Sequence, residues 1–141
     1  MTFAGINYLA ILIAGVAAWL LGAAWYMTLS NPWRAAIGMT PEQMEACKNR
    51  PYAYLPFIFA FVGAVAMAWV LAGLIGHLGP GQVTVKNGVI SGLFCWFGFV
   101  ATTMLVNNSF AMRNPKLLVI DGGYWLVVLA VMGAIIGAMG V

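Results

Sequence analysis

Four long apolar stretches make up most of this 141-residue chain. They run approximately over residues 3–26, 55–76, 87–109 and 117–140. Each reaches the roughly 20 residues that a helix needs to cross about 30 Å of hydrocarbon. Because the chain is 64% hydrophobic and only 6% charged, water could not solvate it as a globule. We therefore predict an all-α membrane protein, a bundle of four transmembrane helices that forms a single membrane domain over residues 1–141.

The first apolar stretch is preceded by no Lys or Arg, and it is longer than the 7–15 residues of a signal-peptide core. We expect it to be retained as a membrane helix, with Met1 at the start of the mature protein. The rest of the chain is an interfacial segment over residues 31–50 and two short turns, which is too little for a second core.

The basic residues are divided five to one between the two sides of the predicted bundle. Arg34, Lys48 and Arg50 precede the second stretch, and Arg113 and Lys116 precede the fourth, whereas Lys86 stands alone before the third. The positive-inside rule then places the two basic loops in the cytoplasm and both termini on the outer side. The bases form no run, so a nucleic-acid partner is not expected.

The segment over residues 31–50 contains the start signals of a short helix. Asn31-Pro32 is expected to end the first helical region, and Thr40-Pro41-Glu42-Gln43 resembles an N-cap, a proline at the first helical position and a capping-box glutamine. A helix over about Pro41–Lys48 should follow. Apolar side chains are spread through this segment and should hold it on the cytoplasmic membrane surface: Trp33, Ile37, Met39 and Met44. We interpret it as a tethered connector, with a regulatory role as the alternative.

Small residues indicate where the helices pack, because close backbone approach supplies much of the attraction between helices in lipid. The second stretch repeats a small residue every four positions, at Ala60, Ala64, Ala68, Ala72 and Gly76, and a neighbouring helix should lie against this face. The other stretches carry shorter sets: Ala14, Ala18 and Gly22; Gly88 and Gly92; Gly133 and Gly137. Such faces serve packing within one chain, self-association or docking on another membrane protein. The remaining surface should contact membrane lipid.

Asp121 is the residue that most suggests chemistry. If Asn114 caps the fourth helix and Pro115 begins it, Asp121 lies roughly 9 Å along the axis, near or inside the apolar boundary, where acids are costly. We predict one polar cluster at the cytoplasmic end of the bundle, built from Asp121, Asn107, Asn108, Thr103 and Tyr26, with Arg113 nearby. The cluster is either a set of hydrogen bonds that fixes helix register or a small binding or proton-linked site.

A weakly polar face is expected on the third helix. Ser91, Cys95, Gly98 and Thr102 follow one another at spacings of four, three and four. Ser91, Cys95 and Thr102 could line a narrow path toward Asp121, or they could let another helix pack closely. Both interpretations remain open at this point.

Catalytic and metal-binding patterns are absent from the sequence. The single His77 closes the second stretch, where an imidazole can bond free helix carbonyls, and a lone histidine has no second ligand to share a metal with. Cys47 and Cys95 are predicted at different membrane depths, too far apart for a disulfide. No G-x-S-x-G, H-E-x-x-H or phosphate-loop motif occurs. We therefore expect a protein that is not an enzyme and that needs no metal or cofactor.

Several short motifs spread over the chain occur in one family. In the first half they are Ile6-Asn7-Tyr8-Leu9-Ala10, Gly22-Ala23-Ala24-Trp25-Tyr26, Pro32-Trp33-Arg34 and Gly38-Met39-Thr40-Pro41-Glu42. In the second half they are Phe97-Gly98-Phe99-Val100-Ala101-Thr102-Thr103, Asn107, Phe110 and Asp121-Gly122-Gly123-Tyr124. With these motifs the chain resembles a family of small bacterial integral-membrane proteins catalogued only as a domain of unknown function. The resemblance implies four membrane helices and, as the expected location, the bacterial inner membrane. It transfers no activity or site.

Two functions are consistent with these features. The first is a homo-oligomeric transporter or channel-like component, whose polar cluster around Asp121 binds or relays a small solute, an ion or a proton. The alternative is a structural or accessory subunit that uses its small-residue faces to dock on a larger membrane complex. The mass of the detergent-solubilised protein separates the two, since the first predicts a closed homo-oligomer and the second a monomer that co-purifies with another protein.

Overall fold

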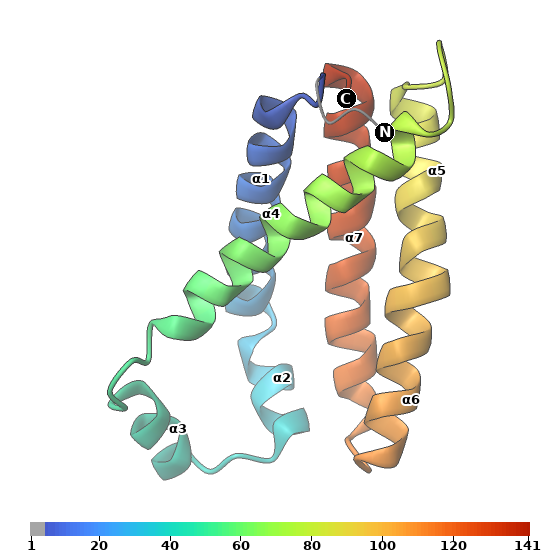
Figure 1. Cartoon of the computed structure of the whole chain (residues 1–141). Coiled ribbons are helices and arrows are strands. Elements are labelled where there is room, and N and C mark those ends of the chain that lie inside the picture. Colours follow the sequence, from blue (N-terminus) through green and yellow to red (C-terminus); the bar gives the residue numbers. More distant parts are fainter. Residues whose placement is uncertain (1–4) are drawn as a thin grey trace.

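The computed structural model describes residues 5–141, which contain helices and no strand. Four helical segments are long and apolar enough to cross a membrane: α1 (Tyr8–Thr28), α4 (Leu55–Gly76), the continuous run Val85–Phe110, and α7 (Pro115–Met139) (Figure 1). The protein is therefore an all-α, multi-pass membrane protein, which confirms the predicted fold class. The second span has the predicted bounds, while the predicted start of the first span at residue 3 lies outside the described residues.

The first and last spans are tied together at the end of the bundle where the C-terminus lies. The Asn7 side chain caps α1 by accepting a hydrogen bond from the Ala10 backbone N–H at 3.0 Å. Its Nδ2 donates to the Met139 carbonyl at 3.0 Å, at the end of α7. One polar side chain at the start of α1 thus satisfies a free backbone group on each of two helices.

Two short helices follow α1 at the opposite end of the bundle. They are α2 (Ser30–Ile37) and the predicted α3 (Pro41–Lys48) (Figure 1). The capping box of α3 is formed, with Gln43 N–H donating to Thr40 Oγ1 at 3.2 Å and Thr40 N–H donating to Gln43 Oε1 at 2.9 Å. The sequence did not predict α2, because Pro32 was taken only as a stop signal. A proline is tolerated in the first turn of a helix, and Pro32 lies there.

The third span is interrupted by a π-helix. It consists of α5 (Val85–Cys95), the π-helical η1 (Trp96–Ala101) and α6 (Thr102–Phe110). A π-turn holds more residues than an α-turn, so it rotates everything that follows around the helix axis. Ser91 and Cys95 are accordingly half-buried, whereas Gly98 and Thr102 are exposed. The prediction that these four side chains share one face is wrong beyond Cys95, because it assumed an uninterrupted α-helical period.

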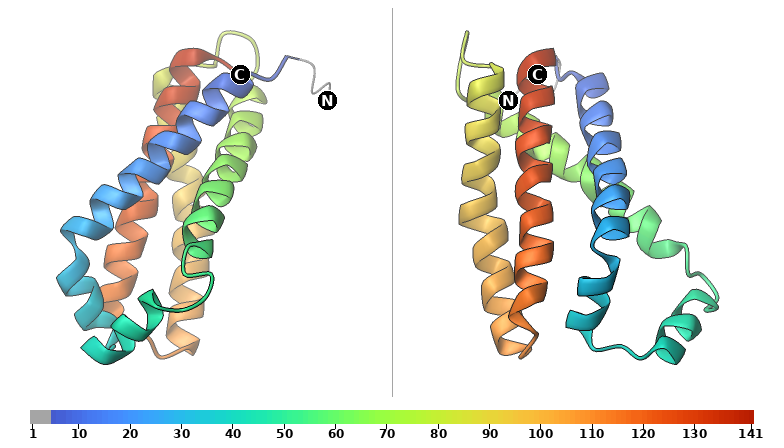
Figure 2. Two further views of the ribbon diagram at one scale, coloured as in Figure 1. Left: turned by 90° about the vertical axis from the view of Figure 1, so that its left-hand side faces the viewer. Right: turned by 180° about the vertical axis from the view of Figure 1, so that it is seen from behind.

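The central element of the bundle is α7. It lies between α1 and the third span, and α4 crosses diagonally over them (Figures 1 and 2). The largest fully buried side chains come from α4 and α7 and form an apolar core: Leu71, Ile75, Val128, Met132 and Ile136. The small-residue face of α4 is buried in the middle of the helix, at Ala64, Ala68 and Ala72. At the two ends of this face, Ala60 and Gly76 are exposed.

Glycines bring α5 and α7 into backbone contact. A Cβ at Gly88 would clash with the Gly133 carbonyl, and a Cβ at Gly133 would clash with the Gly88 carbonyl. Further along the same seam, Gly92 lies under the Leu129 carbonyl. The predicted close-packing faces of the third and fourth spans therefore pack on each other within one chain.

Away from this seam the third span packs on little else. Only 6% of its most apolar 18-residue stretch is buried, against 39% for α7. Large apolar side chains are exposed along it, as expected of a surface that lies within a membrane: Phe94, Phe97, Phe99, Leu105, Val106 and Phe110.

Candidate functional site

An open pocket lies at the end of the bundle where α2 and the α6–α7 turn meet. Its volume is about 550 Å³, within the range of small-molecule sites. Side chains of α1, α2, α6, the turn and α7 line it: Tyr26, Trp33, Met104, Asn107, Asn108, Ala111, Arg113, Asp121 and Trp125. We call this set the Asp121 pocket. It brings charged, amide and aromatic groups together around one carboxylate.

Asp121 is held by a hydrogen bond from the first span. Tyr26 Oη donates to Asp121 Oδ1 at 2.7 Å, which is short, as expected for a bond to a carboxylate. Within residues 5–141 no protein group donates to Oδ2 or forms an ion pair with this carboxylate. One oxygen is thus fixed by the protein and the other remains available to a ligand or water.

Two indole N–H groups donate hydrogen bonds to the backbone carbonyls on either side of Asp121. Trp25 Nε1 donates to the Ile120 carbonyl at 3.1 Å, and Trp96 Nε1 donates to the Gly122 carbonyl at 2.8 Å. Trp96 is also the first residue of the π-helix. These bonds fix both neighbouring spans against the turn of α7 that carries the acid, so the position of Asp121 is determined from two sides.

Glycines make room for these aromatic side chains. A Cβ at Gly123 would lie 3.3 Å from Trp25 Cζ2, so glycine lets the indole lie close to α7. A Cβ at Gly22 would lie 2.9 Å from Tyr124 Oη, and the Tyr124 hydroxyl donates to the Ala18 carbonyl at 3.2 Å. In the Asp121-Gly122-Gly123-Tyr124 motif, Asp121 thus supplies the acid, Gly123 leaves room for the Trp25 indole, and Tyr124 donates the hydrogen bond that joins α7 to α1.

Most of the predicted polar cluster does meet in this pocket. Tyr26, Asn107, Asn108, Arg113 and Asp121 all line it. Arg113 lies on the tight α6–α7 turn, where its backbone N–H donates to the Asn108 carbonyl at 3.0 Å. The turn places the arginine at the rim of the pocket.

Four of the predicted site residues lie elsewhere. Thr103 is exposed and does not line the pocket. The exposed Thr102 donates its hydroxyl back to the Gly98 carbonyl of its own helix at 2.8 Å, and Cys95 packs against the apolar core. Ser91, half-buried on α5, lies well before the π-turn. For Cys95 the structure favours the helix-packing interpretation over the pore-lining one.

Sequence reasoning missed the aromatic part of the pocket. The sequence predicts for Trp33 only that it anchors the segment over residues 31–50 on the membrane, yet it lines the pocket together with Tyr26 and Trp125. The sequence feature that could have indicated the role of Trp33 is its short distance along the chain from Tyr26, with a proline between them. Because α2 follows α1 directly, the two rings come into contact, with centroids 5.8 Å apart. Trp125 follows Asp121 by four residues, so the two share one face of α7.

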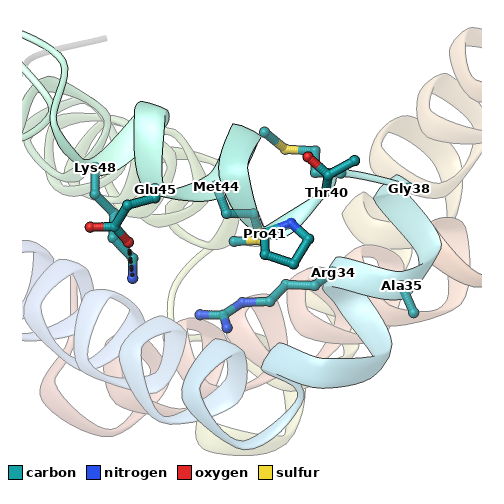
Figure 3. A pocket seen from close by; sticks show the side chains of 9 residues that line it. Arg34, Ala35, Gly38, Thr40, Pro41, Met44, Glu45 and Lys48 are labelled. Atoms are coloured by element: carbon teal, nitrogen blue, oxygen red, sulfur yellow. Dashed lines mark hydrogen bonds and ion pairs between the residues drawn. The ribbon is translucent and has the colours of Figure 1, made fainter.

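A second open pocket of about 590 Å³ lies between α2 and α3. Arg34 extends into it from α2, while Lys48 on α3 pairs with Glu45 at 3.4 Å (Figure 3). The nearby Glu42 is fully exposed, and its own backbone N–H and the Thr40 hydroxyl lower the pKa of its carboxyl. This pocket holds one cation, Arg34, that has no ion-pair partner among the described residues. Its charges are otherwise balanced.

The remaining candidates are structural. His77 Nδ1 lies 2.6 Å from the Gly73 carbonyl, which confirms the predicted capping role at the end of α4. Within residues 5–141 no three His, Cys, Asp or Glu side chains gather as a metal site would require. Two apolar grooves between α1 and α4 are lined by aliphatic and aromatic side chains and suit lipid tails.

The fold and the pocket together define a small multi-pass membrane protein with a polar pocket at one end of its helix bundle. Residues 9–137 match the family model described as Protein of unknown function (DUF1761), and the chain belongs to this family. The match covers nearly the whole chain and confirms the resemblance drawn from its motifs. No curated protein and no solved structure matches the chain.

Proposed function

We propose that this protein is a non-enzymatic transporter or channel-like component of the bacterial inner membrane, and that the Asp121 pocket binds or relays a small solute, an ion or a proton. The observation that carries this proposal is a carboxylate with one free oxygen in an open pocket on a membrane helix. An acid at the centre of a span costs roughly 2.5–3.5 kcal/mol, and less near the edge, and such acids typically have a functional role.

The charges of the chain indicate which side the pocket serves. Five of the six basic residues lie at the end of the bundle that carries α2, α3 and the α6–α7 turn. The positive-inside rule assigns this end to the cytoplasm and both termini to the outer side. The Asp121 pocket then opens to the cytoplasm, and the α2–α3 segment lies on the inner membrane surface.

Self-association is the second part of the proposal. Beyond the pocket the core of one chain is apolar and closed, since Val128, Met132 and Ile136 are 0% exposed. A polar route across the membrane is therefore more readily built between copies than through one chain. The weakly packed third span offers the free surface for such contacts.

Reconstituted protein tests the proposal. Proteoliposomes are assayed for H⁺, Na⁺ and K⁺ flux and for the uptake of small organic solutes, with wild type, Asp121→Asn and Glu45→Gln in parallel. Asparagine retains an acceptor for the Tyr26 hydroxyl, so the fold should persist while the charge is lost. Glu45→Gln is the matched control, because it removes one exposed acid outside the Asp121 pocket. Unchanged flux in folded Asp121→Asn protein would defeat the transport proposal.

One observation favours the alternative function, an accessory subunit of a larger membrane complex. The third span has a single packed side and could dock on another protein as well as on a copy of itself. The mass of the detergent-solubilised protein discriminates the two. A closed homo-oligomer supports the transporter, and a monomer that co-purifies with another membrane protein supports the accessory subunit.

A further inference from the structure

Three aromatic side chains form walls of the Asp121 pocket. Tyr26 and Trp33 meet nearly at right angles, with an interplanar angle of 74° and centroids 5.8 Å apart. Trp125 also lines the pocket, and the ring of Tyr124 lies between it and Tyr26, with centroid distances of 4.8 Å to Trp125 and 5.4 Å to Tyr26. The rings therefore support one another, and the walls of the pocket are fixed before a ligand arrives.

The carboxylate lies among these rings. The hydroxyl of Tyr26 donates to Asp121 Oδ1, so the same residue supplies a ring and positions the acid. Because Oδ2 has no donor within residues 5–141, the negative charge is directed into the pocket and not consumed by an ion pair. The pocket thus combines a negative point charge with π-systems whose faces are also electronegative.

We propose that the ligand of the Asp121 pocket carries an organic ammonium group, which lies against Tyr26, Trp33 and Trp125 with its charge paired to Asp121. This inference rests on the proposed function and names the substrate class of its site. Ring faces attract a cation and a carboxylate neutralises its charge, so the two together select an ammonium over a neutral molecule of the same shape.

The composition of the pocket distinguishes an organic ammonium from a metal ion. Ca²⁺ takes six to eight oxygen ligands and Mg²⁺ near-ideal octahedral ones, typically with more than one carboxylate. Among residues 5–141, Asp121 is the single carboxylate that lines this pocket. A volume of about 550 Å³ with three aromatic walls is larger and more apolar than an inorganic cation requires.

Arg113, at the rim of the pocket, should distinguish ammonium compounds that also carry a carboxylate from those that do not. It forms no ion pair with Asp121 within the described part of the chain, so both charges are available to one ligand. A compound that carries a carboxylate besides its ammonium group would pair with both residues. Replacing Arg113 by glutamine should then weaken glycine betaine more than choline, since choline has no acid group.

Binding to the purified full-length protein tests the inference. The probes are choline, glycine betaine and 3,3-dimethylbutan-1-ol, the uncharged isostere of choline, measured by calorimetry and by the shift in thermal unfolding. We expect at least one of the two ammonium probes to bind saturably and the neutral isostere to bind at least tenfold more weakly. Trp33→Leu should weaken the ammonium probe about fivefold, whereas Trp19→Leu, which removes an exposed indole of α1 outside the pocket, should leave it unchanged.

The outcomes separate this inference from the proposed function. If neither ammonium probe binds, or if the neutral isostere binds as well, or if Trp33→Leu binds like wild type in a folded protein, the ammonium inference is overturned. The proposed function survives that result if Asp121→Asn still abolishes a flux of H⁺, Na⁺, K⁺ or another solute in proteoliposomes. If no flux and no binding depends on Asp121, both fail.

Discussion

Replacing Gly88 by alanine should destabilise the bundle by driving α5 away from α7. The added Cβ would lie well inside 3.0 Å of the Gly133 carbonyl oxygen, a separation that real Cβ atoms essentially never show. Backbone lies on both sides of this contact, so no flexible side chain can move aside. The two helices must instead separate along the seam where Gly92 lies under the Leu129 carbonyl.

The size of the effect follows from the contacts that this separation weakens. A gap of about 0.5–1 Å forfeits roughly a quarter to a half of each dispersion contact along the seam. Over-packing of this kind typically costs about 1–3 kcal/mol, and we expect the free energy of unfolding of Gly88→Ala to fall within that range. Because Gly88 and Gly133 clash with each other's carbonyls, the double variant should lose less than the sum of the two single variants.

The measurement is equilibrium unfolding in mixed micelles with increasing SDS, followed by circular dichroism and tryptophan fluorescence. Gly63→Ala is the matched control, since an added Cβ there meets nothing within 4 Å. Its free energy of unfolding should stay unchanged or rise by up to about 1 kcal/mol, because alanine has a higher helix propensity than glycine. If Gly88→Ala were as stable as Gly63→Ala, the close α5–α7 seam would be refuted.

Three further predictions concern the site and the α2–α3 segment. Trp96→Phe removes the indole bond to the Gly122 carbonyl and should lower the free energy of unfolding in mixed micelles by roughly 0.6–1.7 kcal/mol. Tyr26→Phe should leave the fold intact but weaken any Asp121-dependent ligand at least severalfold in calorimetry, because the carboxylate is no longer positioned. Thr40→Ala should raise the pKa of Glu42 toward its ordinary value in an NMR titration, because the Thr40 hydroxyl no longer stabilises the carboxylate. The stabilisation of α3 by ionised Glu42 is present above the ordinary pKa of a glutamate and is lost as the pH falls through the lowered pKa. An unshifted titration would contradict the contact between Thr40 and Glu42.

The four spans and the capping of the short helices could be predicted because they depend on local signals. The length of an apolar run determines a span, and Thr40 with Gln43 determines the start of α3. The polar cluster around Asp121 was also largely predictable, since Tyr26, Asn107, Asn108 and Arg113 lie at the same predicted membrane depth. Depth along a helix can be read from residue number.

What the sequence does not reveal is rotation about the helix axes. The π-turn over Trp96–Ala101 shifts the later part of the third span, so Thr102 and Thr103 point away from the site that their depth suggested. The aromatic walls were missed for a different reason, because Trp33 reaches the pocket through α2, a helix that the sequence did not predict. Such contacts depend on tertiary packing between elements and not on local pattern.

Side-specific cysteine labelling tests most directly whether the Asp121 pocket is a water-accessible site open to the cytoplasm. Asn107→Cys, which lines the pocket, and Lys86→Cys, at the opposite end of the bundle, are made in a background with Cys47 and Cys95 replaced by serine. A membrane-impermeant maleimide should label position 107 only in inside-out vesicles and position 86 only in intact spheroplasts. Labelling of position 107 from the outer side, or from neither side, would contradict the account.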